Sequence, residues 1–240
     1  MTSEQHQFTA QDRTFPVILV RKKVKNINLH VRNDGTLYVS APVRVPWEYI
    51  EAFLEKKTDF IMRALAEMQE RQQKFPMLTL SDGDTLYLAG RPYTLDVRLG
   101  LQNSIRRSGQ TVFMELAEDT PVMRQKLYHK LLQTLGKKLF PASLDRIQPL
   151  FSDYPLPALV LKQRVMRSRW GSCMPLKGIV TMNTYLAIMP EGIIDHVMLH
   201  ELCHFLQPNH SRHFYDAMTL RMPDWKTRRQ AMMKYLPYCV

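Results

Sequence analysis

The stretch IIDHVMLHELCHFLQPNHSRHF, residues 193–214, decides the predicted fold of the C-terminal half. It contains His200-Glu201-Leu202-Cys203-His204, in which two histidines lie four residues apart. Residues with this spacing share one face of an α-helix, so His200 and His204 can bind one metal ion. Glu201 then lies beside the ion's open position, where a carboxylate can accept a proton from an activated water. The pattern predicts a zinc site with hydrolytic chemistry.

The surrounding residues predict that the motif lies on a buried helix, from about Pro190 to Gln207. A helix start is indicated at Pro190-Glu191, because proline is tolerated in the first turn and an acid there complements the helix dipole. Most of the residues that follow are apolar, which is typical of a core helix. Pro208 should end the helix just after His204. The alternative to a metal site is a core helix whose histidines are only hydrogen-bonded.

A third ligand is expected from the chain beyond this helix. His210 lies six residues after His204, which is the ligand spacing HExxHxxxxxH. Metzincins share this spacing but have Gly midway, where this chain has Gln207, so the match to that clan is incomplete. No glutamate follows Glu201, which excludes the downstream glutamate ligand of gluzincins.

Two other residues compete with His210 for the third position. Asp216 can serve as an aspartate ligand, and His213 is the nearer rival. We expect His210, because a short turn after the helix returns it beneath the motif. His213 lies almost a helical turn further on if Ser211 caps a new helix.

Composition indicates a folded protein of one large or two small domains. The chain has 240 residues, of which 45% are hydrophobic and 23% charged. Neither an export signal nor a run of about 18 apolar residues is present, so we expect a cytoplasmic protein without a membrane span. The widely spaced Cys173, Cys203 and Cys239 fit a reducing compartment rather than a disulfide framework. Of these, Cys173 could approach the metal.

The charge is strongly positive, with 33 Lys and Arg against 22 Asp and Glu, a formal net charge of +11. Such a balance attracts polyanions, so nucleic acid is a possible partner. Basic surfaces without that role are common, and no zinc-finger, RNA-recognition or helix-turn-helix signature is present. The basic residues are clustered at 21–25, 106–107, 164–169 and 226–229.

Hydrophobic periodicity predicts an α+β fold with a β-rich N-terminal part that carries a helical insert, followed by a part with the motif helix and a small sheet. We place the domains at 1–117 and 118–240. A polar tail precedes the first strand, and the helix that starts at Pro121 should pack against the motif helix. The expected strands are 15–31, 36–41, 85–89, 93–99, 111–116, 159–169 and 179–186, and the expected helices are 46–74 with a second start at 58, 121–139 and 190–207.

Several motifs in this order resemble the YgjP-like metallopeptidase family, a bacterial and archaeal group related to the SprT and WLM zincins. The resemblance covers roughly residues 15–235. It implies a zincin-type domain that binds one zinc ion through His200, His204 and His210, with Glu201 as the general base. The motifs that carry it are Ser168-Arg169-Trp170-Gly171-Ser172-Cys173, Asn183-Thr184-Tyr185-Leu186, Pro190, His200-Glu201-Leu202-Cys203-His204 and Asn209-His210-Ser211.

The expected function is a zinc-dependent metallopeptidase that acts on a peptide or protein substrate. Groups that could stabilise the oxyanion or support the ligands are His213, Tyr215, Asn183 and Arg169. Two other functions remain open. One is a metal-dependent hydrolase of nucleotides or phosphoric anhydrides, and the other is a non-enzymatic nucleic-acid-associated protein with a structural zinc.

Overall fold

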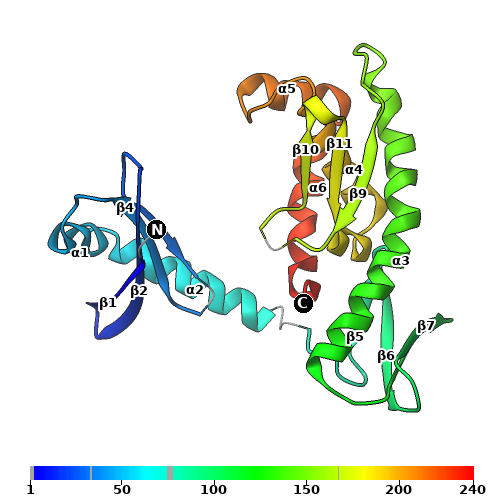
Figure 1. Ribbon diagram of the computed structural model, residues 1–240, viewed down its shortest axis with the longest axis horizontal. Coiled ribbons are helices and arrows are strands. Elements are labelled where there is room, and N and C mark those ends of the chain that lie inside the picture. The colour runs from blue at the N-terminus through cyan, green and yellow to red at the C-terminus, as the bar shows by residue number, and fades with distance from the viewer. Residues whose placement is uncertain (1–2, 33, 75–77, 167) are drawn as a thin grey trace. The chain divides into compact units, whose positions relative to one another are not determined.

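The structure is a computed structural model that describes residues 3–32, 34–74, 78–166 and 168–240 (Figure 1). The chain divides into two compact units, Met1–Pro76 and Met77–Val240. Small sheets and helices occur together in a mixed α+β arrangement, which confirms the predicted fold class. Within the described residues, no helix has both the length and the apolar character needed to cross a membrane.

The first unit is built on a four-stranded sheet with the order β1-β2-β4-β3. Strand β2 pairs antiparallel with β1 and parallel with β4, and β3 pairs antiparallel with β4. The single strand expected at 15–31 is wrong, because this stretch forms two strands, β2 and β3. The expected polar tail is wrong, because residues 3–10 pair with β2 along their whole length. Phe8 is the only large apolar residue of this strand, which weakens its pattern. The strands are β1 (Ser3–Ala10), β2 (Arg13–Lys22), β3 (Asn28–Val31) and β4 (Leu37–Pro42).

Two helices cover one face of this sheet. Helix α1 (Trp47–Glu55) is followed by α2 (Thr58–Lys74), so the predicted second helix start at Thr58 is confirmed. Alternate strand residues and the apolar stripes of the helices form one core, as expected for a sheet with a single covered face. This core contains Phe8, Phe15, Val17, Leu19, Val31, Leu37, Val39, Ala41, Ile50, Leu54 and Ile61.

The second unit begins with a sheet of order β5-β6-β8-β7. Three of its strands fall at the predicted places, whereas β7 was not predicted because Ser104-Ile105-Arg106-Arg107-Ser108 is almost wholly polar. It pairs antiparallel with β8 at the edge of the sheet. The strands are β5 (Thr85–Leu88), β6 (Arg91–Leu99), β7 (Ser104–Ser108) and β8 (Thr111–Leu116).

Helix α3 (Pro121–Ile147) is longer than predicted. It starts at Pro121 as expected, with the Thr120 side chain accepting a hydrogen bond from the Met123 amide. The predicted end near residue 139 is wrong, because the helix continues through Pro141. Proline in a helix interior costs about 3 kcal/mol, and tertiary contacts of the last turns offset that cost. Those turns carry Ser143 and Arg146, which both donate hydrogen bonds to Asp195 of helix α4 (Glu191–Cys203).

The boundary between the units differs from the sequence-based division at 117/118. The first sheet of the second unit, helix α3 and helix α4 share one hydrophobic core. The turn after β5 also bonds to the segment before α4, because the Ala89 and Gly90 amides donate to Ala187 O and Ile188 O, each at 2.8 Å. Residues 78–116 therefore belong with the motif helix, which an element-by-element reading of the sequence does not reveal.

A three-stranded sheet of order β10-β11-β9 lies next to α4, the helix that carries His200 and Glu201. The first parts of the two strands predicted at 159–169 and 179–186 are confirmed, but the segment between them also contains β10 (Gly171–Met174). Helix α4 packs on α3, as predicted. The remaining elements are β9 (Val160–Arg164), β11 (Ile179–Asn183), α4 (Glu191–Cys203), α5 (Arg212–Arg221), α6 (Trp225–Ala231) and the 3₁₀ helices η1 (Gln148–Phe151), η2 (Pro175–Lys177), η3 (Thr184–Ile188) and η4 (Met232–Tyr238).

Candidate metal centre

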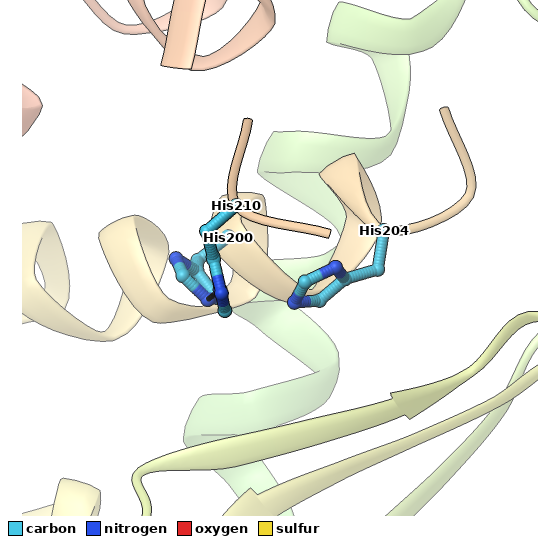
Figure 2. Close-up of side chains that lie close together, drawn as sticks. All are labelled: His200, His204 and His210. Atoms are coloured by element: carbon cyan, nitrogen blue, oxygen red, sulfur yellow. Dashed lines mark hydrogen bonds between the residues drawn. The ribbon is translucent and has the colours of Figure 1, made fainter. Parts of the chain in front are cut away.

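Three histidines converge at the end of α4. His200 lies in its last turn and His204 is its C-cap residue, so the two rings face the same side of the helix. The chain beyond the helix brings His210 back against them, and Figure 2 shows the three rings close together. One nitrogen from each ring lies within 4.8 Å of the other two. The structure thus brings together the three residues that the sequence predicted as metal ligands.

The spacing of these nitrogens fits a zinc ion. His200 Nε2 and His210 Nε2 are 3.0 Å apart. Zinc–nitrogen bonds of about 2.0–2.1 Å in tetrahedral geometry require nitrogen–nitrogen separations of roughly 3.3 Å, so small ring movements suffice. Three imidazole ligands leave the fourth tetrahedral position free. Three protein ligands with one open position are typical of catalytic zinc sites. The residues present therefore fit the ion that the family implies.

Contacts on the far side of the rings hold them in this orientation. The His204 Nδ1 lies 3.2 Å from Gln207 O, and donation to that carbonyl leaves Nε2 free to bind a metal. Phe214 of α5 is fully buried beneath the three rings. Its ring centroid lies 4.9 Å from that of His200 and 4.8 Å from those of His204 and His210. Phe214 thus forms an apolar floor that limits ring rotation.

Burial keeps the two helix histidines neutral, which is the form that binds metal. It lowers the pKa of His200 to about 3, with further lowering by the neighbouring His204 and His210. Burial also lowers the pKa of His204, while the hydrogen bond to Gln207 acts in the opposite direction. Neutral rings at physiological pH need no deprotonation before they bind an ion.

Glu201 is 5% exposed, and its carboxylate faces the same cleft as the triad. Burial raises its pKa to about 7, with a smaller opposing effect from Arg169. Strand β10 packs directly on this carboxylate, since a Cβ added to Gly171 would lie 2.4 Å from Glu201 Oε1. Only glycine fits at this close approach, which gives Trp170-Gly171-Ser172 of the family motif a physical role.

The site opens into a cleft of about 860 Å³ between α4, β10, α6 and the chain around residue 210. One wall is a stack of aromatic rings, in which Trp225 lies between Tyr215 at 5.4 Å and His196 at 6.1 Å. The His196 Nδ1 atom is buried there, and no described residue forms a hydrogen bond with it. Burial, together with Arg229 and Arg228, lowers the pKa of His196 to about 4, so this ring is neutral.

The four supporting residues predicted from sequence lie in different places. Tyr215 and Arg169 line the cleft. Asn183 is buried and does not line the cleft, and its amide bonds to Met166 O and Arg169 O, each at 2.8 Å. It therefore holds the segment that carries Arg169. His213 is exposed on α5 and belongs neither to the triad nor to the cleft wall.

The remaining candidate ligands do not join the triad. Asp216 is exposed on α5 and pairs with Arg212 at 3.8 Å. Cys173 lines the cleft, where burial and the neighbouring Glu201 raise the pKa of its thiol to about 12. Its sulfur is not among the ligand atoms that converge with those of the three histidines.

Sequence reasoning missed three residues that shape the site. Phe214 lies four residues after His210, but a single apolar residue in a sequence does not show that its side chain packs beneath metal ligands. His196 lies four residues before His200, so helical spacing alone could have placed it beside the motif. Trp225 belongs to α6, which shows no recognisable motif. Only the packing of α6 against α4 brings it to the cleft.

Comparison with known proteins identifies a family and shows a partial likeness to a solved structure. The metallopeptidase zymogen of Pyrococcus abyssi abylysin is 18% identical, covers 42% of this chain and 95% of its own, and has a TM-score of 0.34. No curated protein matches the chain. The model of the YgjP-like metallopeptidase domain matches residues 25–235, which include strands β3 and β4 of the first sheet and the histidine triad. The chain therefore belongs to the YgjP-like metallopeptidase domain family.

Proposed function

We propose that this protein is a zinc-dependent peptidase in which His200, His204 and His210 hold one zinc ion and Glu201 is the general base. The observation that carries the proposal is the convergence of three imidazole nitrogens within 4.8 Å beside a buried carboxylate in one cleft. Membership of a metallopeptidase family supports the same reaction class.

Zinc bound at such a site polarises a carbonyl group and lowers the pKa of a water to about 7. The chain supplies the remaining parts. A carboxylate oxygen of Glu201 accepts the proton of the attacking water and delivers it to the leaving amine. The close approach of Gly171 restricts this carboxylate to the cleft side of α4, and Phe214 keeps the imidazoles from turning away.

The cleft wall supports an extended peptide as the substrate. Strand β10 forms an edge of its sheet and pairs only with β11 among the described strands. Its residues Ser172 and Cys173 line the cleft next to Glu201. An extended peptide can add to such an edge through main-chain hydrogen bonds, which places a scissile amide near the catalytic groups.

Metal analysis combined with a peptide library tests the proposal. We expect one zinc per chain, peptide hydrolysis that a chelator abolishes, and recovery when zinc is restored. Glu201→Gln should keep the zinc and lose hydrolysis. Glu191→Gln, an exposed glutamate on the same helix, is the matched control and should behave as the wild type. Zinc-loaded protein that leaves every peptide intact contradicts the proposal.

A second candidate is hydrolysis of phosphoric anhydrides such as nucleotides, and one observation favours it. Arg169 and Arg229 both line the cleft and are exposed, and neither side chain has a hydrogen-bond or ion-pair partner in the described part of the chain. Unpaired guanidinium groups suit phosphate oxygens. A panel of nucleoside triphosphates assayed beside the peptide library separates the two candidates, since turnover of nucleotides with inert peptides favours the second.

A further inference from the structure

The sheet of the first unit has a second face that none of its described helices covers. Both α1 and α2 pack on the core face. On the other side, one row of side chains crosses the strands, because Gln5 pairs with Ile18, Ile18 with Tyr38 and Tyr38 with His30. Most residues on this side are exposed or half-buried. We call it the open face, and its residues are Gln5, Gln7, Pro16, Ile18, Val20, Lys22, Asn28, His30, Tyr38 and Ser40.

Two cations flank the aromatic ring at the centre of the open face. The Arg32 Cζ atom lies 4.8 Å from the centroid of the Tyr38 ring, and the Lys22 Nζ atom lies 5.7 Å from it. Strand β4, which carries Tyr38, lies between β2 and β3 and so is central in the sheet. A guanidinium stacked on a tyrosine extends the flat surface on which another planar group can lie.

Positive charge on this side is not balanced by acids. The exposed Lys23 and Lys25 closely follow Lys22 in the sequence. No residue of the open face is acidic. Glu4 of β1 lies on the opposite face, where it pairs with Arg21 at 3.0 Å. Asp34, two residues after Arg32, interacts with it electrostatically, but its carboxylate is also engaged as the acceptor of the Thr36 amide at 2.9 Å.

We propose that the open face binds single-stranded nucleic acid. Lys22, Lys23, Lys25 and Arg32 contact phosphates, and one base stacks on Tyr38. Polar side chains near Tyr38, such as His30 in the same row and Asn28 in the next row, offer hydrogen bonds to further bases. A cationic surface with a central aromatic ring is the combination that single strands require, because their bases are free to stack. Bases inside a duplex cannot reach the Tyr38 ring.

The test measures binding of a fluorescein-labelled twelve-nucleotide oligouridine to the full chain by fluorescence anisotropy at several salt concentrations. Tyr38→Ala should weaken binding about tenfold, the order expected for one lost base stack, whereas Tyr38→Phe should retain it. Lys22→Gln combined with Arg32→Gln should weaken binding and make the slope of log K against log salt shallower by about 1.4. Thermal unfolding checks that each variant is folded.

Matched controls come from the helical side of the same unit. Tyr49→Ala removes an exposed aromatic residue of α1, and Lys56→Gln with Lys57→Gln removes two exposed charges after it. These variants should bind as the wild type. If Tyr38→Ala does not fold, the Lys22 and Arg32 variant still tests the surface.

Three outcomes overturn the proposal. The first is unchanged affinity of the folded Lys22 and Arg32 variant, because the oligonucleotide then binds elsewhere. The second is equal affinity for a blunt duplex of the same length, because stacking on Tyr38 then plays no part. The third is binding to phosphatidylserine vesicles without binding to the oligonucleotide, which assigns the face to an anionic membrane surface instead.

Discussion

Helix α4 carries two buried carboxylates, Asp195 and Glu201, and their surroundings are opposite in kind. Asp195 is 8% exposed and accepts hydrogen bonds from Ser143 Oγ at 2.6 Å and from Arg146 at 2.8 and 3.0 Å. Glu201 is 5% exposed and has no hydrogen-bond partner in the described part of the chain. Both residues are buried, yet Asp195 is bonded by the protein, whereas the carboxylate of Glu201 faces the cleft.

The difference separates a structural acid from a reactive one. A buried carboxylate with charged and hydroxyl donors stabilises the contact between α3 and α4 and has little tendency to exchange protons. A buried carboxylate without donors holds its charge poorly, and the raised pKa of Glu201 expresses this. Natural proteins rarely leave a buried polar group unpaired, and such groups gather at functional sites.

The largest effect is expected from the third histidine, because Glu201 can act as proposed only beside a metal ion. His210→Ala should abolish turnover and lower zinc affinity by more than the about 10–100-fold typical of a lost supporting hydrogen bond. Zinc content after dialysis and hydrolysis rate are the measurements. His213→Ala is the matched control, since this exposed histidine is three residues away, and it should retain full zinc content. The reverse pattern assigns the ligand to His213.

Removing the reactive carboxylate should affect turnover and leave the fold intact. We expect Glu201→Gln to lower kcat by about 10²–10⁴-fold, the usual contribution of a general base. The zinc content and the unfolding temperature should not fall, because no described residue depends on Glu201 for a hydrogen bond. A glutamine variant that unfolds readily would place Glu201 with Asp195 among the structural acids.

Crowding the reactive carboxylate from the β10 side should have a smaller effect on turnover. In Gly171→Ala the added methyl group meets Glu201 Oε1, which must shift. A displacement of about 1 Å in a catalytic group can cost 10²-fold in rate, so we expect a kcat reduction of that order with zinc retained. Kinetics and metal content measured on one preparation test this. Wild-type kcat in the alanine variant shows that the position of Glu201 is not critical.

Removing the structural carboxylate should change stability and hardly change turnover. Asp195→Ala leaves Ser143 and Arg146 without their acceptor, and we expect a loss of about 2–3 kcal/mol in the free energy of unfolding. We expect a smaller loss of stability than for a fully buried ion pair, because the Arg146 side chain is 38% exposed. Denaturant unfolding measures the loss, and kcat below the unfolding transition should stay near wild type. A large kcat loss in folded protein makes Asp195 part of the site.

Much of the site follows from local sequence. The four-residue spacing of His200 and His204 requires only that α4 be a helix, which its apolar residues and the proline before Glu191 predict. The helix ends at Cys203, four residues before the predicted end at Gln207. Pro208 lies in the short segment that leads back to His210, so the return of His210 also depends on a few neighbouring residues. The α+β class and most strands follow from periodicity for the same reason, since each pattern is set within one element.

Long-range packing decided the rest. Helix α3 continues through Pro141 because Ser143 and Arg146 reach Asp195, about fifty positions further along the chain. The first sheet of the second unit belongs to the core of the motif helix because backbone bonds link residues 89–90 to 187–188. Sequence alone placed two carboxylates on one helix. Which one is satisfied and which is left free depends on α3 and β10, because hydrogen-bond partners and close contacts are supplied by elements distant in sequence.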